Sequence, residues 1–384
     1  MIQRVNPDLK TDLLKLGVKD WNECFHCGNC TAICPLTEDE LLFPRKVIRQ
    51  AQMGLETSLQ ANVSPWMCYY CGECSDTCPR DANPGELMMS LRRYLTSIYD
   101  WTGLSRLFYT NKFMEFAAIL GLAILVILLF AIWGPPLDPS LTSEGGVKIN
   151  SFAPIKWIEL GDWSMAAVVG ALLISNILHM FYKVIIKPGI KIPLTTYITE
   201  LWKLPTHFAT QAKFRKCDTK GKFYWGAHWL MMTGYTIMFT MIVVFLPEFQ
   251  VEEVYDWWHW QRLLGYYATF GLLFGLIFVI IGRIKQNNQI FKFSHLSDWL
   301  FIIMLFLTTI SGILLHLFRV GGMPYATYYT YIAHIAILIP MICIEVPFSK
   351  WSHLAYRPFA IYFAAIKKAA KEQEFKSRLS PEAA

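Results

Sequence analysis

The chain has 384 residues, of which 54% are hydrophobic and 17% are charged, and its mean hydropathy is +0.34. Soluble globular proteins usually have about 25% charged residues, so this chain carries more apolar surface than one aqueous core can bury. The composition excludes a disordered chain and a basic nucleic-acid-binding domain, and it makes membrane helices the first structure to look for.

The first 110 residues have the composition of a water-soluble domain. They contain 11 Lys and Arg against 13 Asp and Glu, and they include no apolar run long enough to cross a bilayer. Eight of the ten cysteines fall within the first 78 residues. We therefore expect a soluble, cysteine-dependent domain over residues 1–110.

After Lys112 the chain becomes strongly apolar. Each apolar run has roughly 18–23 residues, and about 20 residues span a bilayer as a helix. Each run must be helical, because lipid offers no partner for open backbone groups. The runs are 113–133, 163–182, 225–246, 263–282, 299–318 and 327–348. The sequence thus predicts an all-α membrane protein, with six transmembrane helices over residues 111–356 and a basic tail over 357–384.

Lys and Arg are distributed unevenly between the loops. The loops at 183–223 and 283–298 and the segment after 348 share one side with the N-terminal domain and hold 19 Lys and Arg. The loops on the other side hold only Lys148, Lys156, Arg262 and Arg319. By the positive-inside rule we expect a cytoplasmic N-terminal domain in a protein of the cytoplasmic (inner) membrane. The net charge of +6 therefore reports topology and gives no evidence of affinity for an acidic partner.

Two cysteine runs with identical spacing dominate the N-terminal part. They read Cys24-x2-Cys27-x2-Cys30-x3-Cys34-Pro35 and Cys68-x2-Cys71-x2-Cys74-x3-Cys78-Pro79. In two-cluster ferredoxins such a run gives three thiolates to one [4Fe–4S] cluster and its fourth cysteine to the other. We therefore expect cluster one on Cys24, Cys27, Cys30 and Cys78, and cluster two on Cys68, Cys71, Cys74 and Cys34.

Zinc sites and disulfides account for the cysteines less well. Structural zinc needs four ligands but does not call for this triple spacing, and disulfides are rare in the cytoplasm. Between the runs, Pro44 and Gly54 bracket residues that read as a helix crossing from one cluster loop to the other. Outside the eight expected ligands, His26 is interpreted as an exposed non-ligand, and Cys217 and Cys343 as ordinary residues.

Several of the nine histidines fall at membrane depth, where such residues are costly unless they are used. A haem b between helices needs two imidazoles at one depth. The cytoplasmic-side candidates are His179, His228 and His353, and the opposite-side candidates are His259, His316 and His334. His207 and His295 fall in loops and are expected to be solvated.

These two groups predict two stacked haems. We pair His228 with His353 and His316 with His334; His259 remains an alternative for the second pair and His179 for the first. His334 and His353 are 19 residues apart, which leaves them about 100° out of phase on a regular helix. A kink or a one-residue bulge at Pro340 or Pro347 is therefore expected between them.

Glu345 is an acid inside the last apolar run. Intramembrane carboxylates often relay protons or contact ligands, which makes Glu345 the candidate catalytic residue. Its position near the cytoplasmic end also allows a second interpretation, in which the side chain simply snorkels to the interface.

The second cysteine run, together with the first, resembles the C subunit of heterodisulfide reductase. Its residues are Trp66-Met67-Cys68-Tyr69-Tyr70-Cys71-Gly72-Glu73-Cys74, ending in Cys78-Pro79-Arg80. The last five apolar runs resemble the cytochrome b E subunit of heterodisulfide reductase and the gamma subunit of respiratory nitrate reductase.

In the gamma subunit a haem ligand lies at the close of the last helix, which is similar to Pro347-Phe348-Ser349-Lys350 before His353 here. His334 matches the other ligand on that helix, and His228 matches the first ligand of an earlier helix. The gamma subunit has a further His about three turns after that first ligand, whereas this chain has Met238 near that place. His316 is taken as the fourth ligand for this reason.

A fusion of these two modules resembles the C subunit of the quinone-interacting membrane-bound oxidoreductase complex. The resemblance implies a protein that oxidises menaquinol and passes electrons through two b haems and two [4Fe–4S] clusters. It also implies cytoplasmic partners, namely flavin and iron–sulfur subunits similar to heterodisulfide reductase A, and adenylylsulfate reductase as the acceptor in sulfate respiration. No nucleic-acid partner is expected.

Two other functions fit the same features. The first is a membrane subunit of a heterodisulfide reductase-like or sulfite-pathway complex. If such a module reduced a disulfide itself, it would call for a cysteine-rich catalytic motif, and only Cys217 and Cys343 remain outside the runs. The second is a haem-free membrane anchor with structural clusters.

Overall fold

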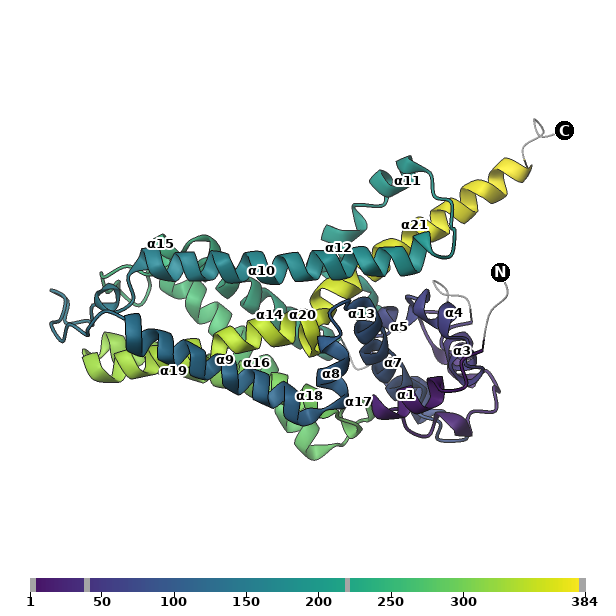
Figure 1. Ribbon diagram of the computed structural model, residues 1–384, viewed down its shortest axis with the longest axis horizontal. Coiled ribbons are helices and arrows are strands. Elements are labelled where there is room, and N and C mark those ends of the chain that lie inside the picture. Colours follow the sequence, from purple (N-terminus) through teal and green to yellow (C-terminus); the bar gives the residue numbers. More distant parts are fainter. Residues whose placement is uncertain (1–4, 38–41, 218–221, 380–384) are drawn as a thin grey trace.

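The computed structural model describes residues 5–37, 42–217 and 222–379. Across these residues the protein is helical, with one isolated antiparallel bridge between Leu141 and Val147 as its only extended pairing. Long helices lie side by side along most of the elongated molecule, and the short helices of the N-terminal part gather at one end (Figure 1). The predicted all-α fold is confirmed.

The N-terminal part consists of short helices joined by turns. They are α1 (Leu9–Lys15), the 3₁₀ turn η1 (Trp21–Glu23), α2 (Asn29–Ile33), α3 (Arg45–Gln52), α4 (Glu56–Gln60), α5 (Ser64–Met67), α6 (Glu73–Asp76), α7 (Pro84–Tyr99) and α8 (Leu104–Thr110). Helix α3 is the helix expected between the cysteine runs, and the chain leaves it through Gly54 at a φ of +64°.

Six helices are long and apolar enough to cross a membrane, which confirms the six predicted spans. Three of them continue as π-helical turns. The helices are α9 (Lys112–Trp133), α10 (Ile155–Phe181) with η3 (Tyr182–Ile186), α14 (Phe223–Phe239) with η4 (Thr240–Val244), α16 (Trp260–Lys285), α18 (Leu296–Val320), and α19 (Pro324–Pro340) with η5 (Met341–Glu345) and α20 (Val346–Phe348).

The remaining elements connect the spans or follow them. They are η2 (Ile149–Ser151), α11 (Leu194–Thr199), α12 (Lys203–Thr210), α13 (Ala212–Cys217), α15 (Leu246–Phe249), α17 (Gln289–Lys292), the 3₁₀ turn η6 (Lys350–Ser352) and α21 (His353–Leu379). Helices α11 to α13 lie between spans two and three, and α17 lies between spans four and five.

The sixth span is the central helix of the bundle. Of its most apolar window 56% is buried inside the protein, against 11–28% for the other five spans. The other spans therefore turn most of their apolar surface outward, as lipid-facing helices do. Residues of the sixth span, including His334 and Glu345, are the ones placed to face protein on several sides.

The core of the N-terminal part extends into the ends of the membrane helices. Tyr99 of α7 packs in one buried cluster with Met180 of α10 and with Tyr356, Phe363 and Ile366 of α21. The boundary expected at residue 357 thus falls inside α21, whose first half is buried and whose residues 371–376 are exposed. The predicted division into domains at residues 110 and 356 stays a prediction, and one buried cluster contains residues from both sides of it.

The last span is irregular between His334 and His353. Pro340 ends α19, and the next five residues form the π turn η5, which inserts an extra residue into the helical repeat. After α20 the chain leaves helical geometry at Ser349, with φ −126° and ψ −145°. The expected irregularity at Pro340 is therefore present, with a second break just before His353.

Candidate functional site

The two cysteine loops have the same local backbone. The residue before the second cysteine has positive φ in both, at His26 (63°) and Tyr70 (58°), and so does the glycine after it, at Gly28 (89°) and Gly72 (90°). Each glycine begins a short helix, α2 or α6, that carries the third cysteine of its run. Two left-handed residues turn the chain sharply between the first and third cysteine, and glycine adopts this geometry at little steric cost.

The thiols fall into the two sets expected from the spacing. Burial raises the pKa of Cys30 to about 11, and the neighbouring thiols that add to this rise are Cys24, Cys27 and Cys78. Burial likewise raises the pKa of Cys74, where the leading neighbours are Cys68, Cys71 and Cys34. The fourth cysteine of each run therefore lies by the other run, which is the donor arrangement that two cubane clusters require.

Further features of the thiols fit clusters better than zinc. The backbone N–H groups of Tyr70 and Ala82 donate to the Sγ atoms of Cys68 and Cys78, at 3.3 and 3.4 Å. Among the described residues no three His, Cys, Asp or Glu side chains converge on a point for one metal ion. Tetrahedral zinc would hold its four thiolates roughly 3.8 Å apart, and a cubane holds its ligands around a larger body.

A cavity lies among the thiols expected for the second cluster. It is lined by the thiols expected for that cluster and by one that was not expected: Cys34, Cys68, Cys71, Cys74 and Cys217. Cys217, interpreted as an ordinary residue, is buried at the wall of this cavity, and that interpretation stays a prediction. Nothing in the spacing along the chain links Cys217 to the two runs.

The second cysteine loop is packed against the membrane part. The carbonyl of Cys68 accepts hydrogen bonds from Arg92 of α7 and from Nη2 of Arg357 on α21, the latter at 3.2 Å. The Tyr70 hydroxyl donates to the carbonyl of Gln289 in α17 at 3.1 Å. A Cβ added to Gly72 would come within 2.9 Å of the Gln289 side chain. This loop is thus held between α7, α17 and α21.

The first cysteine loop faces outward. Cys27 is exposed and the neighbouring Phe25 is 60% exposed. His26 is half-buried, and its Nε2 is in a short hydrogen bond with Oε1 of Gln52 in α3. The cluster expected at this loop therefore lies nearer the surface, and the other lies nearer the membrane helices.

Aromatic rings connect the second loop with His228. Tyr69, between the first two cysteines of that loop, stacks on Phe214 of α13 with centroids 4.9 Å apart and planes 7° apart. Phe214 in turn meets the ring of His228 edge-on at 5.5 Å. The Arg357 guanidinium covers the Tyr69 ring at 4.2 Å.

Three of the four predicted haem ligands have their Nδ1 atom engaged and Nε2 left for a metal. Nδ1 of His228 is 2.9 Å from Oε1 of Gln211, Nδ1 of His353 is 2.9 Å from the carbonyl of Lys350, and Nδ1 of His334 is 2.9 Å from Oγ of Ser311. Such a partner fixes the tautomer of a ligating histidine and leaves Nε2 for the metal. These three residues therefore fit axial ligation by their donor chemistry.

His228 and His353 lie at the same end of the bundle. Burial lowers the pKa of His353, and Arg357 and His228 lower it further. That influence places the two rings in one region of the bundle, where His207 lies as well. His179, the reserve for this pair, instead contacts the carbonyl of Tyr99 through Nδ1 at 3.0 Å.

The second predicted pair is less clearly formed. The ring of His316 meets Tyr266 edge-on at 5.8 Å, with Nε2 3.5 Å from its hydroxyl. His259, the alternative, stacks on Tyr255 at 4.0 Å, and its buried Nδ1 has no hydrogen-bond partner in the described part of the chain. The choice between His316 and His259 as the partner of His334 stays open.

Two histidines expected to be solvated are instead part of the packing. His207 is half-buried beside Tyr69, with Nδ1 3.5 Å from its hydroxyl, and burial lowers its pKa to about 4. His295 is the N-cap of α18 and accepts a hydrogen bond from the backbone N–H of Ser297. Both expectations were wrong, because the loops that carry these residues pack against the N-terminal part.

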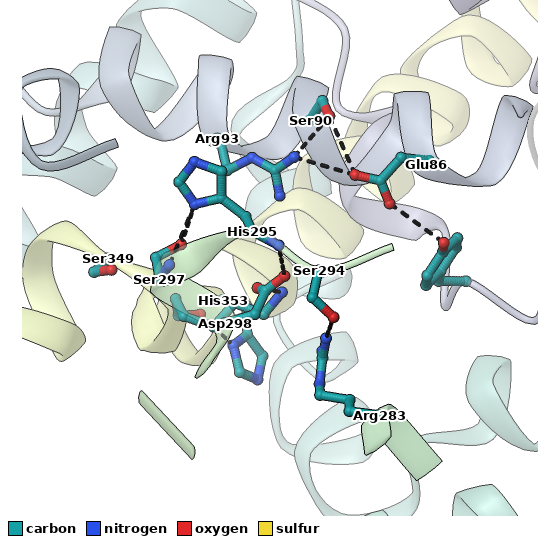
Figure 2. A network of polar contacts seen from close by, with 12 residues as sticks. Glu86, Ser90, Arg93, Arg283, Ser294, His295, Ser297, Asp298, Ser349 and His353 are labelled. Atoms are coloured by element: carbon teal, nitrogen blue, oxygen red, sulfur yellow. Dashed lines mark hydrogen bonds and ion pairs between the residues drawn. The ribbon is translucent and has the colours of Figure 1, made fainter. Parts of the chain in front are cut away.

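Two groups of polar contacts lie next to each other, one on α7 and one at the start of α18 (Figure 2). Arg93 donates to Oε1 of Glu86 at 3.2 Å, to Oγ of Ser90 at 2.7 Å and to the carbonyl of Leu16 at 2.8 Å. His295 lies beside Arg93 in the same view, and its backbone N–H donates to Asp298 at 3.0 Å. Asp298 also forms an ion pair with Lys350, three residues before His353.

Glu345 lies next to these contacts and does not reach solvent. It is 0% exposed, and neither carboxylate oxygen has a hydrogen-bond partner among the described residues. The nearby carboxyl of Glu115 is also buried and accepts a hydrogen bond from Ser349 at 2.6 Å. The snorkelling interpretation of Glu345 is therefore wrong, and Glu115 is a second buried acid that the sequence did not single out.

The N-terminal part matches a known family. Residues 17–79 match the family described as a 4Fe-4S dicluster domain, which contains all eight expected ligands. The chain therefore carries an iron–sulfur domain of the two-cluster kind. No solved structure matches the chain.

Curated relatives of this part come from methanogenic archaea. The C2 subunit of the H(2)/formate:CoB-CoM heterodisulfide,ferredoxin reductase of Methanococcus maripaludis is 36% identical over 75 residues, which are 20% of this chain and 40% of the relative. The second iron-sulfur C subunit of the CoB--CoM heterodisulfide reductase of Methanocaldococcus jannaschii is 35% identical over 91 residues, 23% and 48%. The C subunit of the ferredoxin:CoB-CoM heterodisulfide reductase of Methanosarcina mazei is 35% identical over 81 residues, 21% and 50%. The chain thus spans half or less of these relatives.

Proposed function

We propose that this chain is the membrane electron-transfer subunit of a heterodisulfide reductase-like complex. In this role it passes electrons between a quinol in the bilayer, menaquinol by the resemblance to quinone-interacting complexes, and soluble partner subunits at its N-terminal end. The iron–sulfur domain supports electron transfer, and the relatives support the heterodisulfide reductase type. The quinol, the two b haems and the cytoplasmic side are part of the proposal.

The observation that carries the proposal is the packing of the second cysteine loop against α21. Arg357 of α21 holds the carbonyl of Cys68, and His353 lies one turn earlier on the same helix. A cluster ligand and a proposed haem ligand are thereby attached to one rigid element. Bound clusters and haems would supply one-electron storage, and the fold keeps their ligands at fixed positions.

The chain's own residues prepare both proposed haem positions. Gln211, Lys350 and Ser311 orient the rings of His228, His353 and His334 through their Nδ1 atoms. Locking the rings in advance lowers the reorganisation needed when iron binds. His228 with His353 would hold one haem, and His334 with His316 or His259 the other.

Glu345 is proposed to handle protons. Oxidation of a quinol releases two protons with its two electrons, so the site needs an acceptor near the membrane. A fully buried carboxylate without a partner is costly in its charged form and gains most from taking up a proton. Glu115 and Ser349 beside it provide a second acceptor and a hydroxyl between the two.

The relatives support a heterodisulfide reductase-like complex, and the proposed partners within it follow from the family resemblance. Flavin and iron–sulfur subunits similar to heterodisulfide reductase A would meet the exposed first cysteine loop. Adenylylsulfate reductase as acceptor rests on the resemblance of the whole chain alone, and the relatives give it no support.

The test is an optical spectrum of the purified full chain with and without dithionite, together with ligand variants. We expect a reduced b-type band that His353→Ala and His228→Ala both diminish, with His207→Ala as the control that keeps it. A chain with full iron–sulfur content and no b-type band would instead be the haem-free anchor. Unchanged haem in both ligand variants would overturn the His228–His353 assignment.

A further inference from the structure

Helix α13 stands between the second cysteine loop and the third membrane span. Its contacts come from two of its residues and from the residue directly before it. Gln211, directly before the helix, bonds His228; Phe214 stacks on Tyr69; and Cys217 lines the cavity of the second cluster. Helix α13 and the residue directly before it therefore contact both the second cluster site and the proposed haem ligand His228.

We propose that Cys217 is a fifth cysteine of the second cluster site. Its thiol lies against the cluster, does not serve as one of the four ligands, and helps to set the reduction potential of that cluster. The residue acts through the cluster and its ligands, so it is a positioning residue. The proposal rests on the two-cluster domain and is independent of the haems and the quinol.

The position of Cys217 carries the first part of the argument. It is 2% exposed and belongs to the same buried cluster as the cysteine loops, with Cys34, Cys68, Cys71 and Cys74 around the same cavity. The four others already satisfy one cubane. Cys217 is therefore a fifth thiol at the wall of a cavity that the four expected ligands of the second cluster also line.

The chemistry carries the second part. A cysteine S–H is a weak hydrogen-bond donor, and the sulfide and thiolate sulfurs of a cluster are acceptors. Hydrogen bonds to the sulfurs are among the features that set cluster potentials. The reduced cluster has the greater negative charge and gains more from a donor, so the S–H group raises the reduction potential. No bond is formed or broken in this role.

The isolated position of Cys217 in the sequence agrees with a role that depends on the fold. The loop that carries it also contains nine Lys and Arg between residues 183 and 223, yet the wall it presents to the cluster is a thiol and an aromatic ring. Arg357 and Arg92 supply the nearby positive charge from other helices, at the Cys68 carbonyl.

The experiment is an EPR-monitored redox titration of the purified full chain, with iron and sulfide content measured on each sample. The variants are Cys217→Ala, Cys217→Ser and, as a matched control, Cys343→Ala, which removes the other cysteine outside the runs. We expect all three to keep both clusters. Cys217→Ala should lower the potential of one cluster and change its EPR line shape, and the other cluster should be unaffected.

The serine variant and the control separate a hydrogen-bond donor from a ligand. Cys217→Ser keeps a donor at the same place, so it should restore the potential toward that of the unaltered chain, and Cys343→Ala should not move either potential. Unchanged potentials and spectra in both Cys217 variants would overturn the proposal. Loss of one cluster's iron in Cys217→Ser would overturn it as well, because Cys217 would then be a ligand. Absence of haem from the same samples would refute the proposed function and leave this test intact.

Discussion

Replacing Arg93 with methionine should loosen the packing of α7 within the N-terminal part. Arg93 and Glu86 are buried partners whose side chains are only 6% and 8% exposed, and Arg93 also donates to Ser90 and Leu16. Methionine fills much of the same volume but leaves the Glu86 carboxylate without its cation. Breaking a buried pair in this way typically costs about 3–5 kcal/mol.

The pH dependence follows from the direction of the Glu86 shift. Burial raises the pKa of Glu86 above its usual value, even with the opposing effect of Arg93. A carboxyl with a raised pKa in the fold contributes most below its unfolded pKa, and that contribution is lost as pH rises. Removing Arg93 raises the pKa further, so the loss should be larger at pH 8 than near pH 5.

Hydrogen exchange of α7 in the full detergent-solubilised chain measures this loss locally. Since 1.4 kcal/mol corresponds to a factor of ten, exchange should accelerate roughly 10²–10⁴-fold in Arg93→Met. The matched control is Arg80→Met, whose pair with Glu23 is more than half exposed and worth under about 1 kcal/mol.

The double variant Glu86→Gln with Arg93→Met removes both charges and should recover much of the loss. If Arg93→Met accelerated exchange no more than Arg80→Met does, the idea that this buried pair stabilises α7 would be refuted.

Three further predictions concern the two cysteine loops and His295, the N-cap of α18. Cys34→Ala should remove cluster two and leave cluster one, and Cys78→Ala should remove cluster one and leave cluster two, as EPR spectra can show. If each variant instead lost the cluster of its own cysteine run, the crossed assignment would be contradicted. Gly72→Ala should lower the stability of the fold by at least about 1–2 kcal/mol, because its φ is +90° and the new Cβ would meet the Gln289 side chain. In the control Gly103→Ala the new Cβ meets nothing within 4 Å, so the loss should be smaller. Thermal unfolding of the two variants measures the difference. Burial lowers the pKa of His295 to about 4, so the fold should lose stability as pH falls from 6.5 toward 4, by about 1.4 kcal/mol for each unit of the shift. His295→Asn keeps a hydrogen-bond acceptor at the N-cap but does not titrate. The thermal stability of this variant should therefore depend less on pH over the same range.

The cysteine spacing was enough to predict two sets of four thiols, and Pro44 and Gly54 were enough to predict the helix between the runs. The left-handed residues Gly28 and Gly72, which turn each loop, were found only in the structure. The six spans were equally predictable, because a bilayer requires apolar helices of nearly fixed length. Ligand spacing depends on residues that are close in the chain, and the length of an apolar run depends on the thickness of the bilayer, so both can be recognised in the sequence.

The surroundings of single polar residues were not predictable. His207 and His295 read as loop residues, and Cys217 as an isolated one, but loops between spans fold back onto the N-terminal part and bury them. Glu345 was predicted either to relay protons or to snorkel to the interface, and the central position of the sixth span keeps it at 0% exposure. Burial depends on what packs over a residue, and contacts between distant segments leave no periodic trace.

The sequence by itself determined that this protein has two ferredoxin-type cysteine sets on a six-helix membrane body, since ligand spacing and apolar length are local properties. Only the tertiary structure decided which set lies against the membrane helices. It also joined Cys68 to α21 through Arg357 and brought Cys217 into the cavity of the second set. These relations depend on close packing between segments far apart in the chain, where one buried hydrogen bond or shared cavity fixes the distance.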